Sequence, residues 1–356
     1  MQTFHAACLL AAVAAIQGGL LAQTVNITPV GARTGEFCAP DRALIFEDPT
    51  GVRILYDPAT TVAGGSDARL GRIDVLLVSH AHGDHLGSAK LNQDPNASDA
   101  ACGSQIPTVP TPDSNAAEIA AAKGAAVIGS GELTAFIGTK IQHLAGMAAP
   151  GCPTAGPTNE TIVPVGQACL GNLGYGAKRT VRAGNAGEGV QISLVTALHG
   201  NGLSNNMISD PLASELASNG LTFAPGSASG FVLIFTNGLR VYLSGDTGLT
   251  SDMLTIVRGF YRAHLVVFNI GDIFTTGPEE AAFAVNELIR PAAVIPSHVN
   301  EATTTNGVVN PGTKTARFIQ LVNEAAVFPP LSGVTMEFDR HARCVAGCST
   351  QDTGRH

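Results

Sequence analysis

The sequence predicts an α/β protein in which β-sheets lie between outer helices, and three observations support this class. Residues 73–80 and 264–271 are rich in β-branched and large apolar residues, which is typical of buried strands. Residues 48–51 and 237–238 carry turn signals between apolar runs. Helical patterns follow strands in both halves of the chain, so we expect helices to cover the sheets.

The first half of the chain alternates predicted strands with loops and helices. Two strands flank the turn at residues 48–51, and the buried strand at 73–80 follows them. A loop rich in Pro, Asn, Asp and Ser spans 92–115. A helix then begins at Asn115, and Gly124 separates it from a short strand and a second helix.

Two irregular segments, residues 145–185 and 203–228, are predicted to be insertions into a single domain that spans residues 23–356. Both are rich in loop-forming residues, and long structureless loops in a compact domain are often functional. The remaining predicted elements are a strand at 189–199, a hairpin with a two-residue turn at 237–238, a helix at 249–260, a strand at 264–271, a helix at 278–290, a strand at 292–298 and a helix at 314–325.

The amino-acid composition and net charge limit the kinds of substrate and partner that the protein can bind. The chain has 356 residues, of which 45% are hydrophobic and 13% charged, so it can bury a large core. Its net charge is −8, and no run of Lys and Arg could neutralise several phosphates. We therefore expect a small-molecule substrate rather than a nucleic acid. The sequence assigns no oligomeric state.

The N-terminus is predicted to be an export signal, residues 1–22, cleaved near Ala22. The stretch from Ala6 to Ala22 is uncharged, almost entirely apolar and too short for an ordinary membrane span. The five residues before it carry no Lys or Arg, and a buried N-terminal helix is the alternative interpretation. We expect the mature protein in the periplasm or outside the cell, with no membrane association.

Cysteine usage agrees with export. Six cysteines remain once Cys8 is removed with the signal, and an even number in an exported protein suggests disulfides. The sequence does not choose among the possible pairings. A zinc-binding cysteine cluster is a weaker alternative, because no Cys-x2-Cys pair occurs. The six are Cys38, Cys102, Cys152, Cys169, Cys344 and Cys348.

The segment Ser-His-Ala-His-Gly-Asp-His, which follows the strand at 73–80, carries the strongest chemical signal. It places His80, His82, Asp84 and His85 within six residues. Imidazole and carboxylate are ligands for zinc and also for manganese and iron. His80 and His82 can point the same way from an extended backbone, and the glycine between them and Asp84 allows a turn toward a second point.

Three further ligand types each stand at the end of a predicted strand: His199, Asp246 and His298. Strand ends on one edge of a sheet are where α/β folds gather their sites. Together the seven residues complete two coordination shells. One shell would contain His80, His82 and His199; the other would contain Asp84, His85 and His298, with Asp246 as a bridge between two divalent metal ions.

The order of these motifs resembles the metallo-β-lactamase superfamily of metal-dependent hydrolases. The block from GDTGLTSDM through IGDIFTTGPEEAA to IPSHVNE is similar to the branch related to L-ascorbate-6-phosphate lactonase, as are GVRILYDP and IDVLLVSHAHGDHLG. The resemblance implies an αββα sandwich: two mixed sheets face to face, helices outside and metals at one edge. Val299 stands where that branch usually has an aromatic residue, which predicts a different pocket wall.

The function that follows is hydrolysis of an ester or lactone by a hydroxide that bridges two metal ions, with zinc expected and manganese or iron as alternatives. Asp84 would hold one metal and orient the nucleophile, and Asp246 would bridge both. Asn300 and Asp272 are candidates for substrate contacts or for supporting the metal ligands. The two insertions are expected to form a lid over the site.

Three alternatives remain open on the sequence alone. A phosphodiester and a β-lactam are the other substrates that the superfamily resemblance suggests. A non-catalytic metal-binding protein on the same fold belongs to a different functional class. The sequence of such a non-catalytic protein would be expected to lack one of the metal ligands, and none of the seven is missing here.

Overall fold

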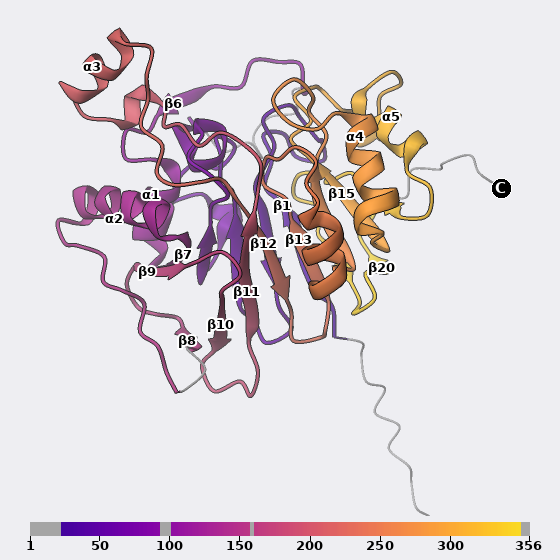
Figure 1. Cartoon of the computed structure of the whole chain (residues 1–356), viewed down its shortest axis with the longest axis horizontal. Coiled ribbons are helices and arrows are strands. Elements are labelled where there is room, and N and C mark those ends of the chain that lie inside the picture. The colour runs from indigo at the N-terminus through magenta and orange to yellow at the C-terminus, as the bar shows by residue number, and fades with distance from the viewer. Residues whose placement is uncertain (1–22, 93–100, 157–159, 350–356) are drawn as a thin grey trace, which may run out of the picture.

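The computed structural model describes residues 23–92, 101–156 and 160–349. The predicted export signal, residues 1–22, lies outside the described residues. Two eight-stranded mixed sheets dominate the fold, and helices lie outside them on both sides (Figure 1). The predicted αββα sandwich is therefore confirmed.

The first sheet has the strand order β20-β19-β1-β2-β3-β4-β7-β9. Its strands from β3 to β9 pair in parallel, whereas those from β20 to β3 pair antiparallel. The strands are β1 (Val25–Pro29), β2 (Leu44–Glu47), β3 (Arg53–Tyr56), β4 (Val75–Leu77), β7 (Ala126–Ser130), β9 (Cys169–Leu173), β19 (Met336–Phe338) and β20 (Cys344–Ala346).

The second sheet has the order β18-β15-β14-β13-β12-β11-β10-β8. Strands β13, β14, β15 and β18 pair in parallel, and β10 to β13 form antiparallel pairs. The strands are β8 (Glu160–Val163), β10 (Lys178–Ala183), β11 (Val190–Thr196), β12 (Ser229–Ile234), β13 (Arg240–Leu243), β14 (Leu265–Asn269), β15 (Ala293–Ser297) and β18 (Ala326–Val327).

Two small hairpin sheets and the helices complete the described structure. The hairpins pair β5 (Ala89–Leu91) with β6 (Thr108–Pro110) and β16 (Thr304–Thr305) with β17 (Val308–Val309). The helices are α1 (Asn115–Lys123), α2 (Gly131–Ala145), α3 (Leu212–Ser218), α4 (Pro278–Phe283) and α5 (Lys314–Leu321), with short 3-10 or π segments η1 (Ala68–Leu70), η2 (Gly83–Gly87), η4 (Asn205–Met207), η5 (Met253–Tyr261) and η6 (Ala284–Ile289).

The apolar core forms three layers that match this architecture. Side chains such as Ile54 and Val241 fill the space between the two sheets. Ile119 and Ile137 of α1 and α2 pack on the outer face of the first sheet. Phe318 of α5 packs with the outer face of the second sheet, together with η5 and η6. In Figure 1 the α1–α2 pair and the α4–α5 pair lie on opposite sides of the sheets.

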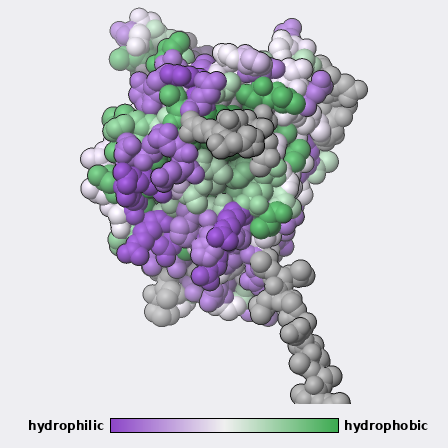
Figure 2. All heavy atoms as spheres, turned by 90° about the vertical axis from the view of Figure 1, so that its right-hand side faces the viewer, coloured by the Kyte–Doolittle hydropathy of each residue, from purple (hydrophilic) through white to green (hydrophobic). Residues whose placement is uncertain are grey.

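The side that carries α4 and α5 faces the viewer in Figure 2. Hydrophilic residues cover much of its lower and left parts, and hydrophobic residues gather nearer its centre. Several large apolar side chains of the outer helices are exposed, including Phe260 of η5 and Phe283 of α4. The outer helix layer is thus only partly polar.

The hairpin around Asn237 differs from its prediction in loop length. Ile234 pairs with Arg240, and the N–H of Phe235 donates to the carbonyl of Leu239, which leaves residues 236–238 as a three-residue loop. Gly238 takes a positive φ of 92°. This is the arrangement in which a turn ends in a left-handed residue, so the predicted two-residue turn is wrong.

Segment 145–185 contains three strands, β8, β9 and β10, rather than an irregular loop throughout. It contributes β9 to the edge of the first sheet, and β8 and β10 to the edge of the second. Segment 203–228 contains η4 and α3, and no residue of α3 is buried. In Figure 1, α3 projects from the body of the molecule near β6.

Three disulfides join the six cysteines: Cys38–Cys102, Cys152–Cys169 and Cys344–Cys348. The predicted use of these cysteines in disulfides is therefore confirmed. Each of the six pairs with the cysteine next to it in the order of the sequence. Among the described residues, no helix combines the length and the apolar character that crossing a membrane requires.

Candidate metal centre

All seven predicted ligands lie at one edge of the sandwich, because the strands before them end there. His80 follows β4, His199 follows β11, Asp246 follows β13 and His298 follows β15. Strands β11, β13 and β15 run in the same direction in the second sheet. The first sheet supplies the cluster that begins at His80, so the two sheets meet at this edge.

The turn that carries three of the ligands is held in place locally. The carbonyl of His82 accepts hydrogen bonds from the N–H groups of His85 and Leu86, which starts the η2 turn. A Cβ on Gly83 would lie 2.2 Å from Oγ of Ser88 and 2.6 Å from Oγ of Ser204. Only glycine fits this close approach, and it lets Asp84 and His85 turn away from His82.

The ligand atoms gather into three groups in which they all lie within 4.8 Å of one another. Nε2 of His199 lies 3.2 Å from Nδ1 of His82, and Nε2 of His298 lies 3.2 Å from Oδ2 of Asp84. The geometry therefore brings together both shells that the sequence predicted. The groups are His80–His82–His199, His80–His85–Asp246 and Asp84–His85–His298.

Asp246 lies between the two shells. Its Oδ2 is 3.0 Å from Nε2 of His298, 3.5 Å from Nε2 of His199 and 3.9 Å from Nε2 of His80. Its Oδ1 is 3.2 Å from Nε2 of His85. One carboxylate thus reaches histidines of both shells, as a bridging ligand must.

Several of these atoms are buried without a hydrogen-bond partner in the described structure: Nε2 of His80, Nε2 of His85 and Oδ1 of Asp246. A buried polar atom without a partner costs about 1–3 kcal/mol. Three such atoms that converge on one point form a donor set that divalent ions of the zinc type accept. The residues therefore fit a metal centre.

The histidines of the first shell are held in the neutral form that binds metals. Burial lowers the pKa of His80 well below its ordinary value, and the neighbouring His85 lowers it further. Burial also lowers the pKa of His82 and of His199. A neutral imidazole has a free lone pair at neutral pH, which is what a metal ligand needs.

The carboxylates of Asp84 and Asp246 stay ionised although desolvation opposes their negative charge. Burial opposes ionisation of Asp246, but His85 and His298 outweigh it and hold the pKa of Asp246 well below its usual range. The same two histidines, with Arg42, hold the pKa of Asp84 far below its usual range against the effect of burial. Both side chains are thus anionic ligands at neutral pH.

Behind the ligands, Asp57 orients two histidines. Its Oδ2 lies 2.8 Å from Nδ1 of His85 and accepts a hydrogen bond from Oγ of Ser79. Oγ of Ser79 in turn lies 2.9 Å from Nδ1 of His80. A carboxylate on the far nitrogen fixes the tautomer and direction of a ligating histidine. Sequence reasoning missed this role, although Asp57 stands in the GVRILYDP motif.

Arg42 is a second residue that the sequence analysis missed. Its buried side chain donates to Oδ1 of Asn300 at 2.8 Å and to Oδ2 of Asp84 at 3.4 Å. Its other nitrogen donates to the carbonyls of Ala39 and Asp41, which fixes the guanidinium. No local pattern marks this arginine as part of the site, because Asp84 and Asn300 are far away in sequence.

A cavity of about 470 Å³ opens onto the ligands. The two predicted substrate-contact residues, Asn300 and Asp272, both line it, although Oδ1 of Asp272 also accepts from the N–H of Ile273. Val299 lies fully buried in the helix-side core and does not itself line the cavity. The lining residues are His82, Asp84, His199, Asp246, Gly271, Asp272, Ile273, Phe274, His298, Asn300 and Lys314.

Neither insertion contributes a described residue to this lining. The lid over the site that the sequence predicted is therefore not formed by the described residues of 145–185 or 203–228. Segment 203–228 instead braces the ligand loop: Oδ1 of Asn201 accepts from the N–H of Ala81 at 2.5 Å, and Nδ2 of Asn201 donates to the carbonyls of Pro225 and Gly226.

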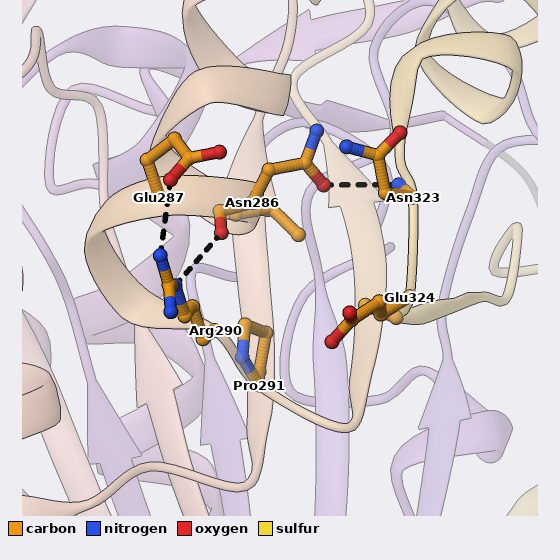
Figure 3. A pocket seen from close by; sticks show the side chains of 8 residues that line it. Asn286, Glu287, Arg290, Pro291, Asn323 and Glu324 are labelled. Atoms are coloured by element: carbon orange, nitrogen blue, oxygen red, sulfur yellow. Dashed lines mark hydrogen bonds and ion pairs between the residues drawn. The ribbon is translucent and has the colours of Figure 1, made fainter.

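A separate pocket of about 200 Å³ lies beside η6 (Figure 3). Three of its polar side chains are already paired: Arg290 with Glu287 at 3.1 Å, and Oδ1 of Asn286 with the N–H of Asn323 at 3.0 Å. It shares no residue with the ligand cluster. The cavity over the seven ligands is therefore the better candidate for a site of chemistry.

Comparison with known proteins agrees with this geometry. The family model described as the beta-lactamase superfamily domain matches residues 41–298, a span that contains all seven ligands. A metal-dependent hydrolase of Polynucleobacter asymbioticus is 28% identical over 305 residues, which covers 82% of each chain. Another, from Pyrobaculum islandicum, is 30% identical over 225 residues and covers 63% of this chain and 64% of its own length.

Among solved structures, the metallo hydrolase Igni18 of Ignicoccus hospitalis matches 89% of this chain and all of its own, with a TM-score of 0.51 and 20% identity. At this level of identity the match supports the fold alone. The names of these relatives state no substrate, so the resemblance to the lactonase branch stays a prediction.

Proposed function

We propose that this chain, which belongs to the beta-lactamase superfamily of metal-dependent hydrolases, is an exported enzyme that uses two divalent metal ions to hydrolyse an ester or lactone. The observation that carries the proposal is the position of Asp246. Its carboxylate reaches histidines of both ligand groups, which supports a dinuclear centre over a single ion.

His80, His82 and His199 would hold one ion, and Asp84, His85 and His298 the other, with Asp246 shared. When bound, the two ions supply a Lewis acid and lower the pKa of a water molecule between them. Zinc is the metal that we expect for this set of imidazoles and carboxylates.

The protein side chains then position the reaction. Asp84 is 46% exposed toward the cavity and is oriented by Arg42 and His298, so its free oxygen is available to orient the attacking water. Asn300 is held by Arg42 and faces the substrate space. The amide of Asn300 can donate a hydrogen bond to an oxygen on which negative charge develops.

The ester or lactone class rests on the sequence resemblance to the lactonase branch and is supported by the mixed character of the cavity. Its lining combines ligand and amide side chains with the apolar side chains of Ile273 and Phe274. Such a wall suits a carbonyl substrate with an apolar group. Fold alone does not assign a substrate, so turnover must decide.

Export is supported by the disulfides. Three of them join the six cysteines that would remain after cleavage of residues 1–22. Disulfides persist in oxidising compartments and are rare in the cytosol. The proposal predicts that the secreted or periplasmic chain begins close to Gln23, which intact-mass measurement of the exported protein checks.

Elemental analysis with a substrate panel tests the enzymatic proposal. We expect about two metal ions per chain in the wild type. His82→Ala and Asp246→Ala should lose both metal and turnover. The control His341→Ala, at an exposed histidine outside the ligand groups, should keep both. The panel contains a lactone, an aryl ester, a bis-aryl phosphodiester and a cephalosporin.

The fastest substrate in the panel names the class. Preference for the phosphodiester or the cephalosporin would replace the ester and lactone assignment while leaving the metal centre intact. A protein that takes up no added zinc or manganese and turns over nothing in the panel would contradict the enzyme itself.

A further inference from the structure

Lys314 places a cation on the wall of the catalytic cavity. It is the first residue of α5, and its side chain lines the cavity together with Asn300 and Asp272. The carboxylate of Glu301 already occupies the start of the helix, where it accepts the N–H groups of Lys314 and Thr315. The first N–H groups of α5 are therefore satisfied by Glu301, and the ammonium group of Lys314, which has no acceptor atom, plays no part in capping the helix.

No carboxylate in the part of the chain that the structure describes forms an ion pair with this ammonium group. Among the described residues, the lysine ion pairs are those of Lys90 with Glu118 and of Lys140 with Asp113. Nζ of Lys314 donates one hydrogen bond, to the carbonyl of Gly271. An ammonium has three donors, so two remain available to a ligand in the cavity.

The contact with Gly271 fixes the ammonium close to the metal ligands. A Cβ on Gly271 would lie 2.0 Å from the carbonyl of His298 and 2.8 Å from Nδ2 of Asn300. Gly271 is therefore packed directly against the turn that carries His298. A substrate bound at the metals would extend to Lys314 across this one residue.

Next to this positively charged part of the wall, the residues just after Gly271 form an apolar part. Ile273 and Phe274 line the cavity, and they are 87% and 73% exposed. Asp272 and Ile273 have positive φ values of 63° and 64°, which is unusual and costly for an isoleucine. The loop thus holds two apolar side chains in water beside the site, although neither gains burial in the protein.

We propose that the cavity selects an ester or lactone that carries an anionic group, bound by Lys314, and an apolar segment, covered by Ile273 and Phe274. This proposal rests on the hydrolase function proposed above and adds the substrate class. A monoester of a straight-chain dicarboxylic acid combines these features: an ester, an apolar chain and a free carboxylate. Lys314 acts here as a binding residue for specificity and takes no part in bond cleavage.

Binding of reaction products tests the proposal without relying on turnover. Zinc-loaded protein is titrated calorimetrically with the dicarboxylates from succinate to suberate and with the matched monocarboxylates. One carboxylate can bind the metals, and only a dicarboxylate has a second for Lys314. We expect the best dicarboxylate to bind at least about tenfold more tightly than its monocarboxylate, as one charge-assisted contact supplies.

Variants assign this preference to the side chain. Lys314→Gln should reduce the preference to about one and leave monocarboxylate affinity unchanged, whereas Lys314→Arg should retain most of it. Phe274→Ala should weaken both members of each pair, because the apolar segment is common to them. Lys178→Gln, at an exposed lysine of β10, is the matched control and should behave as wild type.

Turnover of phenyl hydrogen adipate and of phenyl hexanoate adds the kinetic arm. Lys314→Gln should raise KM for the adipate ester about tenfold and leave kcat and the hexanoate ester unchanged. Equal losses on both esters would show that Lys314 only supports the loop, and a wild type that prefers neither the adipate ester over the hexanoate ester nor a dicarboxylate over its monocarboxylate would also overturn the proposal. If neither ester is hydrolysed but dicarboxylate binding depends on Lys314, the ester function fails and the anion site stands.

Discussion

At the scale of single residues, the metal centre depends on side chains that would not touch a metal. Asp57 is the clearest case, because its carboxylate bonds His85 directly and reaches His80 through Ser79. The same carboxylate also accepts the N–H of Ser79, so it ties the end of β3 to the start of the ligand loop. One buried group thus sets the direction of two ligands.

Replacing this carboxylate by an amide should weaken the centre without removing a ligand. For Asp57→Asn we expect metal affinity to fall about 10–100-fold, because the amide loses the negative charge and keeps one acceptor oxygen where Ser79 and His85 together use two. Competition with a chromogenic chelator measures the affinity. Asp113→Asn, on the surface beside Lys140 and His143, is the control. Unchanged affinity in Asp57→Asn would contradict the orienting role.

The ligands could be predicted from sequence, and their supporting residues could not. His80, His82, Asp84 and His85 form one dense local motif, and the later three each follow a predicted strand. Arg42 and Lys314 carry no such local signal, since what distinguishes them is contact with Asn300 and Gly271, far away along the chain. Tertiary contacts of this kind exist only once the strands have been assembled.

At the scale of elements, strong periodic patterns predicted structure well, and edge strands escaped prediction. The helices and strand between Asn115 and Ala145 were predicted in order and type. Segment 145–185 was expected to be loop, because its Gly, Pro and Asn content is poor in strand signal. Its strands pair with β7 and β11, so partners in the sheets, rather than local propensity, decide their conformation.

The insertion at 203–228 has two parts: a base that supports the ligand loop and a part that projects from the molecule. Asn201 ties its return segment to the N–H of Ala81, between two metal ligands. Helix α3 buries no residue, whereas Leu203 and Phe223 pair through their backbones at the base. The base therefore supports the site, and the projecting part adds no contact to it.

Deleting the projecting part should accordingly leave the enzyme active. With residues 210–220 replaced by a short Gly-Ser linker, we expect kcat/KM to stay close to wild type and the free energy of unfolding to change by less than about 1 kcal/mol. Asn201→Ala should instead cost about 1–3 kcal/mol, because the buried N–H of Ala81 loses its acceptor. Thermal unfolding and steady-state kinetics measure both. A large loss of kcat/KM in the deletion variant would instead support the predicted lid over the site.

At the scale of the whole molecule, the ligand cluster joins the two sheets. His80 through His85 belong to the first sheet, whereas Asp246 and His298 belong to the second. Elsewhere the sheets are held by apolar packing between their inner faces. At this edge, buried carboxylates and imidazoles replace that packing, and several of their atoms have no hydrogen-bond partner among the described residues.

Metal binding should therefore stabilise the entire fold as well as enable chemistry. Free metal at a hundredfold excess over its Kd stabilises a protein that binds it only when folded by about 2.7 kcal/mol. For a domain of this size, removing the metal should lower Tm by roughly 3–5 °C. Scanning calorimetry of the oxidised protein with and without a chelator makes the measurement, and oxidising conditions keep the three disulfides intact.

The Asp246→Ala variant makes this measurement specific to the site. Because it should not hold both metals, chelation should change its Tm by much less than that of the wild type. Amide exchange in the chelated wild type should then rise first at the ends of β4 and β13, where the two sheets would lose their common ligands. Equal Tm values for the wild type with and without chelator would mean that the two sheets meet at this edge without help from a metal.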